Sequence, residues 1–306
     1  MDNKASITAL MSAFARAYHS ANSVKPVFND FIACQLMSDE EYDMMCKYVT
    51  GGIDFFAPDK KDSFRDNEEM LKWIVETQLA PTPLARAKFC EDSLKTAIMT
   101  GTEQYVILGA GLDTFAWREK ELMQRISVFE ADHPLTQEDK KQRLKRANLE
   151  LPENLRFISV DFAKDDLRSR LAEGGFDENK KTFFSWLGVS YYLSEAEING
   201  FLGNLSSFAA DGSTLLFDYA DGNLFTSDVK RVQNMLAMAQ AGGEPMKSCF
   251  SYGRMEELLA KYNFMIYEFL SADDIQERYF VNRTDPLSAF ENISYALAVI
   301  KKDNFN

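Results

Sequence analysis

The sequence predicts an α/β protein in which a mostly parallel β-sheet follows an N-terminal helical lobe. Up to about residue 100, apolar side chains recur at steps of three and four residues, which is the spacing of amphipathic helices. From about residue 105, short runs rich in β-branched and aromatic residues alternate with helical segments. Such alternation is typical of a parallel sheet with helices on both faces.

Seven segments of the chain are predicted to be strands, and the last two can pair as an antiparallel ending to the sheet. These strands cover 105–109, 126–132, 155–161, 182–189, 213–219, 264–270 and 293–300. The helices expected among them cover 134–147, 166–172, 194–208 and 254–261. Ser194, followed by Glu197 three residues later, forms a capping-box pattern that predicts the start of one helix.

The chain is predicted to have two parts. Residues 1–95 form a helical lobe or cap, and residues 96–306 form an α/β domain with an insertion at about 221–252. The insertion is expected because glycines and a proline interrupt the alternation of strands and helices there. Pro81 and Pro83 mark the start of the last lobe helix, since the fixed φ of proline suits a first helical turn.

Composition excludes several classes of protein. The 306 residues are 46% hydrophobic and 26% charged, which is typical of a globular chain and not of a disordered one. The formal net charge of −13 repels phosphate backbones and anionic lipid, so neither nucleic acid nor a membrane surface is an expected partner. A small molecule is the expected partner, and the sequence makes no prediction of the oligomeric state.

Cysteine and histidine usage bears on compartment and metal binding. The four cysteines are far apart and form no C-x-x-C pair, which favours a reducing, cytoplasmic compartment over a disulfide framework. No segment has the apolar length of a signal-peptide core or a membrane helix. The two histidines have no neighbouring ligands at metal-binding spacing, so no metal site is expected.

The most informative segment follows the first predicted strand and reads VILGAGLDT. Gly109 and Gly111 allow a tight turn and let a ligand approach backbone N–H groups, which indicates a nucleotide-like ligand. A dinucleotide fingerprint needs a third glycine where this chain has Thr114, and this disfavours a nicotinamide cofactor. For the two glycines taken alone, a plain tight turn remains an alternative.

Carboxylates end the next two predicted strands. Glu130 and Asp132 follow Gly109 at close to the spacing of about 20 residues at which an acid binds ribose hydroxyls, and Asp132 is the preferred candidate. Asp161 and Phe162 end the third strand. Because the carboxyl ends of adjacent parallel strands lie side by side, Gly109, Asp132 and Asp161 are predicted to line one crevice. The alternatives are a turn at Asp132 and a helix N-cap at Asp161.

Four segments, in chain order, resemble the motifs of the leucine carboxyl methyltransferase-like family of S-adenosylmethionine-dependent O-methyltransferases. They are VILGAGLDTFAWR, FEADHP, SVDF and FSWLGVSYYLS. The resemblance implies a class I methyltransferase fold, a Rossmann-like sheet of seven strands with the final one reversed. Leu187 stands where the phosphatase-methylating eukaryotic branch has a glutamate. The chain is therefore more similar to the bacterial small-molecule branch, whose inferred acceptors are polyketide carboxyl or hydroxyl groups.

The resemblance also implies roles for individual residues. Arg86 would bind the methionine carboxylate of S-adenosyl-L-methionine, because a guanidinium grips a carboxylate through two hydrogen bonds. Asp132 would hold the ribose, and Asp161 with Phe162 would contact the adenine. A solvated helical arginine is the alternative for Arg86. The candidate cofactor-binding residues are Arg86, Gly109, Gly111, Asp113, Glu130, Asp132, Asp161 and Phe162.

Methyl transfer requires alignment and exclusion of water more than acid or base groups. A carboxylate acceptor is already ionised at neutral pH, whereas an alcohol or a phenol needs a base. Tyr191 and Tyr192, at the end of the fourth strand, are candidates for orienting the acceptor, with ordinary packing as the alternative. Since no histidine lies beside them, a carboxylate acceptor is favoured. A base from the lobe, such as His19, would allow a hydroxyl acceptor.

The helical lobe and the insertion are expected to cover the crevice and form the acceptor pocket, because ligands bind at the carboxyl ends of parallel strands. The leading hypothesis is an S-adenosyl-L-methionine-dependent O-methyltransferase that forms a methyl ester on a small molecule. Two alternatives remain open from the sequence. One is a nicotinamide-dependent oxidoreductase, and the other is a catalytically inactive cofactor-binding or partner module.

Overall fold

The computed structural model describes residues 7–302, and this part of the chain contains one seven-stranded sheet in the order β3-β2-β1-β4-β5-β7-β6. Only β7 runs antiparallel to its neighbours β5 and β6, and the other pairs are parallel. The predicted α/β fold with a reversed final strand is therefore confirmed. The strands are β1 (Gln104–Leu108), β2 (Ser127–Asp132), β3 (Leu155–Ser159), β4 (Thr182–Trp186), β5 (Thr214–Ala220), β6 (Phe264–Leu270) and β7 (Ile293–Ile300).

Helices cover both faces of the sheet. In β1, Tyr105 and Ile107 join the core on one face, whereas Val106 and Leu108 join the core on the other, as the two-residue period of a strand requires. The first face is covered by α5 (Pro81–Met99), α6 (Phe115–Arg118), α7 (Lys120–Met123), α8 (Pro134–Arg146) and α13 (Ala272–Ile275). The second is covered by α9 (Leu167–Glu173), α10 (Glu195–Phe208) and α12 (Tyr252–Ala260).

Two predicted helix starts are confirmed. The side chain of Ser194 accepts a hydrogen bond from the Glu197 N–H, and the Glu197 side chain accepts one from the Ser194 N–H, so α10 begins with a capping box. Pro81 and Pro83 both lie in the first turn of α5, where the missing N–H of proline leaves no helical hydrogen bond unmade.

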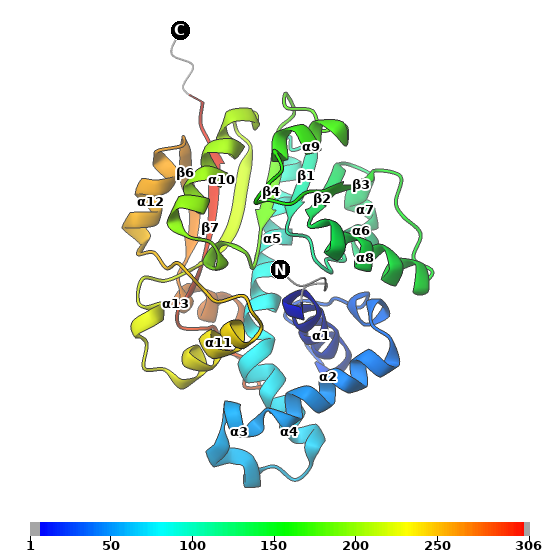
Figure 1. Cartoon of the computed structure of the whole chain (residues 1–306), viewed down its shortest axis with the longest axis vertical. Coiled ribbons are helices and arrows are strands. Elements are labelled where there is room, and N and C mark those ends of the chain that lie inside the picture. The colour runs from blue at the N-terminus through cyan, green and yellow to red at the C-terminus, as the bar shows by residue number, and fades with distance from the viewer. Residues whose placement is uncertain (1–6, 303–306) are drawn as a thin grey trace.

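The N-terminal helices gather at one end of the molecule, beyond the carboxyl ends of the parallel strands (Figure 1). They are α1 (Ile7–Asn22), α2 (Asp39–Gly51), α3 (Ile53–Phe56) and α4 (Asn67–Ile74). From this end α5 continues onto the sheet, where Phe89 stacks on Tyr295 of β7 with 6.0 Å between ring centroids. The boundary predicted near residue 95 falls within α5, and the division into two domains stays a prediction.

The chain between β5 and α12 contains one long helix, α11 (Lys230–Ala241), flanked by irregular segments. This helix meets the N-terminal helices, because the Asn234 side chain donates a hydrogen bond of 3.0 Å to the Phe56 carbonyl. The segment predicted as an insertion therefore lies against the helical lobe. Among residues 7–302, no helix is both long enough and apolar enough to span a bilayer.

Candidate functional site

The segment that joins β1 to α6, residues 109–114, is here called the glycine loop. Gly109 and Gly111 have φ values of +72° and +50°, in the left-handed region that glycine adopts without strain. A Cβ atom on Gly109 would lie 2.9 Å from Cγ2 of Val189, which follows β4. The loop therefore needs glycine at this position and lies directly against the segment after the neighbouring strand.

Asp132, the last residue of β2, is hydrogen-bonded to the glycine loop. Its carboxylate accepts a hydrogen bond from the Gly111 N–H and another, of 2.6 Å, from the His133 N–H. Burial raises the pKa of Asp132, and the two N–H donors act against that rise. The structure thus brings together Gly111 and Asp132, two of the residues selected from sequence.

The end of β3 lies beside the end of β2. Asp161 Oδ2 is 4.0 Å from Nε2 of His133 and 2.6 Å from Nζ of Lys164. Hydrogen bonds from Lys164 and from the Ala163 N–H hold the pKa of Asp161 below its usual range, so this carboxylate is ionised at neutral pH. Phe162 is 43% exposed, which leaves its ring open to an aromatic ligand.

Glu130 and Asp113 make their contacts away from the hydrogen bond between Gly111 and Asp132. Glu130 is only 1% exposed and forms an ion pair with Lys140 of α8 inside the protein, where burial raises its pKa to about 7. The Lys140 ammonium also lies 5.4 Å from the centre of the Trp117 ring. Asp113 accepts a hydrogen bond of 2.7 Å from the Phe115 N–H at the start of α6. Of the two acids near the end of β2, Asp132 is the one that contacts the glycine loop.

Arg86 of α5 belongs to a second cluster. Its Nη1 atom donates hydrogen bonds to Oδ2 of Asp218, at 2.9 Å, and to the hydroxyl of Tyr191, at 3.0 Å. Asp218 lies in β5 and is fully buried, and its Oδ1 accepts a hydrogen bond of 2.6 Å from the Gly188 N–H. A Cβ atom on Gly188, where φ is +73°, would lie 2.6 Å from Nη2 of Arg86.

One edge of this guanidinium is therefore fixed by protein. Within residues 7–302, Nε and Nη2 of Arg86 have no hydrogen-bond partner. A guanidinium edge with two parallel N–H donors matches the two oxygens of a carboxylate. Asp218 and Gly188 were not selected from the sequence, although an aspartate inside the apolar run LLFDYA was a signal.

Tyr191 and Tyr192 follow β4 and pack edge to face, with 4.7 Å between ring centroids. Burial raises the pKa of Tyr191 above its usual range and that of Tyr192 to about 12, so both phenols are protonated at neutral pH. His19 lies in the lobe, where its Nε2 accepts a hydrogen bond from the Val27 N–H and burial lowers its pKa to about 4.

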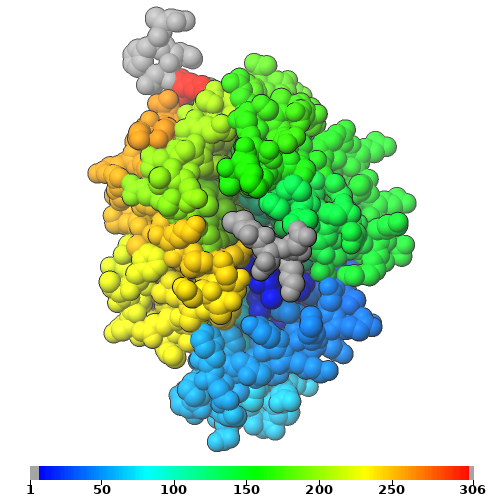
Figure 2. Space-filling model, in the orientation of Figure 1, coloured from blue at the N-terminus to red at the C-terminus, as the bar shows by residue number. Residues whose placement is uncertain are grey.

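The start of α1 lies between the glycine loop and the segment after β5. A Cβ atom on Gly111 would be 3.1 Å from Cβ of Ala9, and the Thr8 hydroxyl donates a hydrogen bond to Glu244. Figure 2 shows this face of the molecule hollowed near its centre, between the green atoms of the β1 to β4 half and the yellow-green atoms of the chain after it. The described contacts place α1 at the edge of the candidate site.

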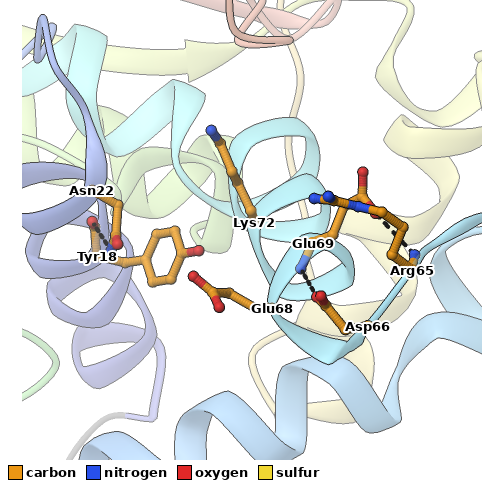
Figure 3. A pocket seen from close by; sticks show the side chains of 7 residues that line it. All are labelled: Tyr18, Asn22, Arg65, Asp66, Glu68, Glu69 and Lys72. Carbon is orange, nitrogen blue, oxygen red and sulfur yellow. Dashed lines mark hydrogen bonds and ion pairs between the residues drawn. The ribbon is translucent and has the colours of Figure 1, made fainter.

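A separate polar hollow of about 410 Å³ lies on the helical lobe. Figure 3 shows Tyr18 and Asn22 of α1 on one side of it and Glu68 and Lys72 of α4 on the other. None of its lining residues belongs to the loops at the strand ends. This hollow is therefore distinct from the candidate site.

Comparison with known proteins identifies the family. The family model described as leucine carboxyl methyltransferase matches residues 9–206. YktD of Bacillus subtilis (strain 168), named as an S-adenosyl-L-methionine-dependent methyltransferase, is 49% identical over 302 residues, which cover 98% of this chain and 99% of that protein. The chain belongs to the leucine carboxyl methyltransferase family. The resemblance of its four motifs to those of this family is thereby confirmed.

A more distant relative agrees with this assignment, and two solved structures share the fold. A Mycolicibacterium paratuberculosis protein, also named as an S-adenosyl-L-methionine-dependent methyltransferase, is 30% identical over 234 residues, covering 76% of this chain and 71% of that protein. A crystal structure of a methyltransferase from Thermobifida fusca YX shares the fold, with a TM-score of 0.56 at 13% identity and coverage of 98% and 96%. A DUF574 family protein from Streptomyces avermitilis has a TM-score of 0.52 at 14% identity, with coverage of 84% and 95%.

This leucine carboxyl methyltransferase family member uses S-adenosyl-L-methionine as its cofactor. The nicotinamide alternative is therefore wrong. The residues at the strand ends fit the cofactor, because the glycine loop turns tightly beside the Asp132 carboxylate and Arg86 has an edge of two donors without a protein partner among the described residues. The enzyme is an S-adenosyl-L-methionine-dependent methyltransferase.

Proposed function

We propose that this methyltransferase transfers its methyl group to the oxygen of a small-molecule carboxylate and so forms a methyl ester. The observation that carries the proposal is the pair of protonated phenols, Tyr191 and Tyr192, beside Arg86. A protonated phenol donates a hydrogen bond and does not accept a proton, so it suits an acceptor that is ionised before it binds. A family description that refers to a carboxyl group agrees with this choice.

The proposed cofactor site extends from α5 along the ends of β1, β2 and β3. Arg86 would bind the methionine carboxylate through Nε and Nη2, and Gly109 and Gly111 would let the cofactor approach the backbone. Asp132 would accept hydrogen bonds from the ribose hydroxyls, and the adenine would lie against Asp161 and Phe162. When bound, S-adenosyl-L-methionine supplies a methyl group on a positively charged sulfur.

Glu130 and Asp113 have indirect parts in this proposal. Lys140, which is paired with Glu130, acts to lower the pKa of Asp132 against the effect of burial. Glu130 would therefore hold the lysine that favours the ionised form of Asp132. Asp113 would fix the junction between the glycine loop and α6 through its hydrogen bond to the Phe115 N–H.

The residues of the chain would position the acceptor and exclude water. Because the Tyr191 oxygen accepts a hydrogen bond from Arg86, its own proton is available to an acceptor carboxylate. The main-chain N–H of Lys247 donates a hydrogen bond of 2.7 Å to the Tyr191 carbonyl, so the segment after β5 holds Tyr191 in place. That segment and the first turn of α1 would cover the acceptor during transfer.

We also place the enzyme in the reducing cytoplasm and expect neither nucleic acid nor membrane as a partner. The four cysteines are all unpaired thiols, as expected where disulfides are kept reduced. The net charge of −13 opposes binding to polyanionic partners.

The chemical fate of a transferred label tests the acceptor class. The purified enzyme is incubated with methyl-labelled S-adenosyl-L-methionine and an extract of bacterial small molecules, and the products are treated with alkali. A methyl ester releases its label as volatile methanol, whereas a methyl ether retains it. We expect volatile label. Alkali-stable label would contradict the carboxylate proposal and indicate a hydroxyl acceptor, and the Asp132→Ala variant serves as the control with weakened cofactor binding.

A further inference from the structure

A buried polar network joins the helical lobe to the glycine loop. Asp30, in the segment after α1, is only 1% exposed. Its Oδ1 accepts a hydrogen bond of 2.6 Å from the Thr114 hydroxyl, and its Oδ2 accepts one of 2.8 Å from Nε of Arg16. Thr114, at the end of the glycine loop, is also 1% exposed. A residue of the lobe is thus hydrogen-bonded to the loop at the position where a dinucleotide fingerprint has its third glycine.

Arg16 of α1 holds the same loop at a second point. Its Nη2 donates a hydrogen bond of 2.8 Å to the carbonyl oxygen of Leu112, and its Nη1 donates one of 2.9 Å to Ser12. One guanidinium therefore contacts α1, Asp30 and the main chain of the glycine loop at once. Lysine has a single ammonium group and does not reproduce this fork of donors.

Arg118 of α6 completes the network. Its Nε donates a hydrogen bond of 2.8 Å to the Thr114 hydroxyl, and the same atom is 3.3 Å from Oδ1 of Asp30. The other end of the guanidinium pairs with Glu91 of α5. Two guanidinium groups thus face two carboxylates, so the charges of the network balance, as buried charges require.

We propose that Arg16 and Asp30 are positioning residues for S-adenosyl-L-methionine, because they set the shape of the glycine loop from outside it. Gly109 and Gly111 have no side chains to pack, so the loop depends on contacts made by others. The anchors at Leu112 and Thr114 follow Gly111, whose N–H is bonded to Asp132. If these anchors are lost, the backbone N–H groups of the loop no longer keep their positions relative to Asp132, and the cofactor loses contacts with both. This inference rests on the proposed cofactor site.

The chain offers a matched control for simple docking of the lobe. Arg143 of α8 donates a hydrogen bond of 2.9 Å to the Leu36 carbonyl and forms an ion pair of 2.9 Å with Glu41. Arg143 therefore also joins the lobe to the α/β part of the chain, and it does so through α8 and not through the glycine loop. Arg143→Lys removes a guanidinium with several N–H donors, as Arg16→Lys does.

The test measures binding of S-adenosylhomocysteine by calorimetry, and the melting temperature by thermal unfolding, for five variants of the full chain, one of which is Asp132→Ala. We expect Arg16→Lys and Thr114→Val to weaken binding about tenfold, the effect of losing one or two hydrogen bonds. We expect Thr114→Ser, which keeps the hydroxyl, and Arg143→Lys to stay within about twofold of the wild type. Hydrogen exchange of the Gly111 amide should be faster in the first two variants and unchanged in Arg143→Lys.

The outcomes separate the inference from the site on which it rests. If Arg143→Lys and Arg16→Lys lower the melting temperature equally and also weaken binding equally, the network only docks the lobe and has no positioning role. If Asp132→Ala weakens binding while Arg16→Lys and Thr114→Val do not, the positioning role is wrong and the cofactor site stands. Unchanged affinity in Asp132→Ala would overturn the cofactor site itself. Should Arg16→Lys fail to fold, Thr114→Val decides, since it removes a single hydroxyl.

Discussion

The two halves of the proposed cofactor site are built differently. At the ends of β2 and β3, Phe162 is exposed and Asp161 is partly exposed, and the carboxylates of Asp132 and Asp161 are held by backbone N–H groups and a lysine. Where α5 packs against β5, Arg86 and Asp218 form an ion pair whose carboxylate is fully buried. We expect single substitutions in the first half to affect the stability of the fold less than substitutions at the buried Asp218 of the second half. Substitutions in the first half should therefore weaken cofactor binding more than they lower the free energy of unfolding, and substitutions in the second half should lower the free energy of unfolding.

The largest effect is expected from Asp218→Ala. Removing one partner of a buried ion pair leaves an uncompensated charge and lowers the free energy of unfolding by about 3–5 kcal/mol. Urea unfolding of the variant measures this loss. Asp161→Ala is the control from the exposed half and should change the stability by less than about 0.5 kcal/mol. Similar losses in both variants would remove the distinction between the halves.

Asp132→Ala should act mainly on binding. The lost charged hydrogen bonds are expected to weaken the affinity for S-adenosylhomocysteine by about 1–3 kcal/mol. Calorimetric titration of the wild type and the variant measures the difference. An affinity equal to that of the wild type would exclude Asp132 from the site.

Phe162→Ala should have a smaller effect. Stacking of a base on an aromatic ring contributes about 1–3 kcal/mol, and an exposed ring belongs to the lower part of that range. The same titration tests this expectation, with Phe162→Tyr as the control that keeps the ring. Equal affinity in wild type and Phe162→Ala would show that the adenine does not lie on this side chain.

The pH dependence should also differ between the halves. Burial raises the pKa of Asp132, so this group takes up a proton at a higher pH than an ordinary aspartate, and binding should weaken on acidification before Asp161 titrates. The methyl-transfer rate at saturating cofactor and acceptor should stay flat from about pH 6 to pH 10, because Tyr191 and Tyr192 remain protonated there. A rate that rises with pH through this range would indicate a base and contradict the carboxylate acceptor.

The sequence predicts the sheet well because each strand is marked locally. The alternation of apolar runs and helical segments, the capping box at Ser194 and the glycines after the first strand are all patterns within a few residues. The strand order likewise predicts that Gly109, Asp132 and Asp161 line one crevice. These features depend on local propensity and on the parallel arrangement of neighbouring strands.

The remaining parts of the site depend on contacts between distant segments. Arg86 and Asp218 are 132 positions apart, and Asp30 and Thr114 are 84 positions apart, so no local pattern relates them. Glu130 and Asp132 look alike in the sequence, and only the position of Lys140 on α8 places Glu130 in the core. Tertiary packing decides which charged side chains meet, and one sequence does not contain that information in a readable form.

A crystal structure of the complex with S-adenosylhomocysteine tests the central claim most directly. The ligand carboxylate is predicted to lie within hydrogen-bond distance of Nε and Nη2 of Arg86, and the ribose hydroxyls on the carboxylate of Asp132. A ligand bound elsewhere, or one that leaves both side chains without contact, would contradict the account.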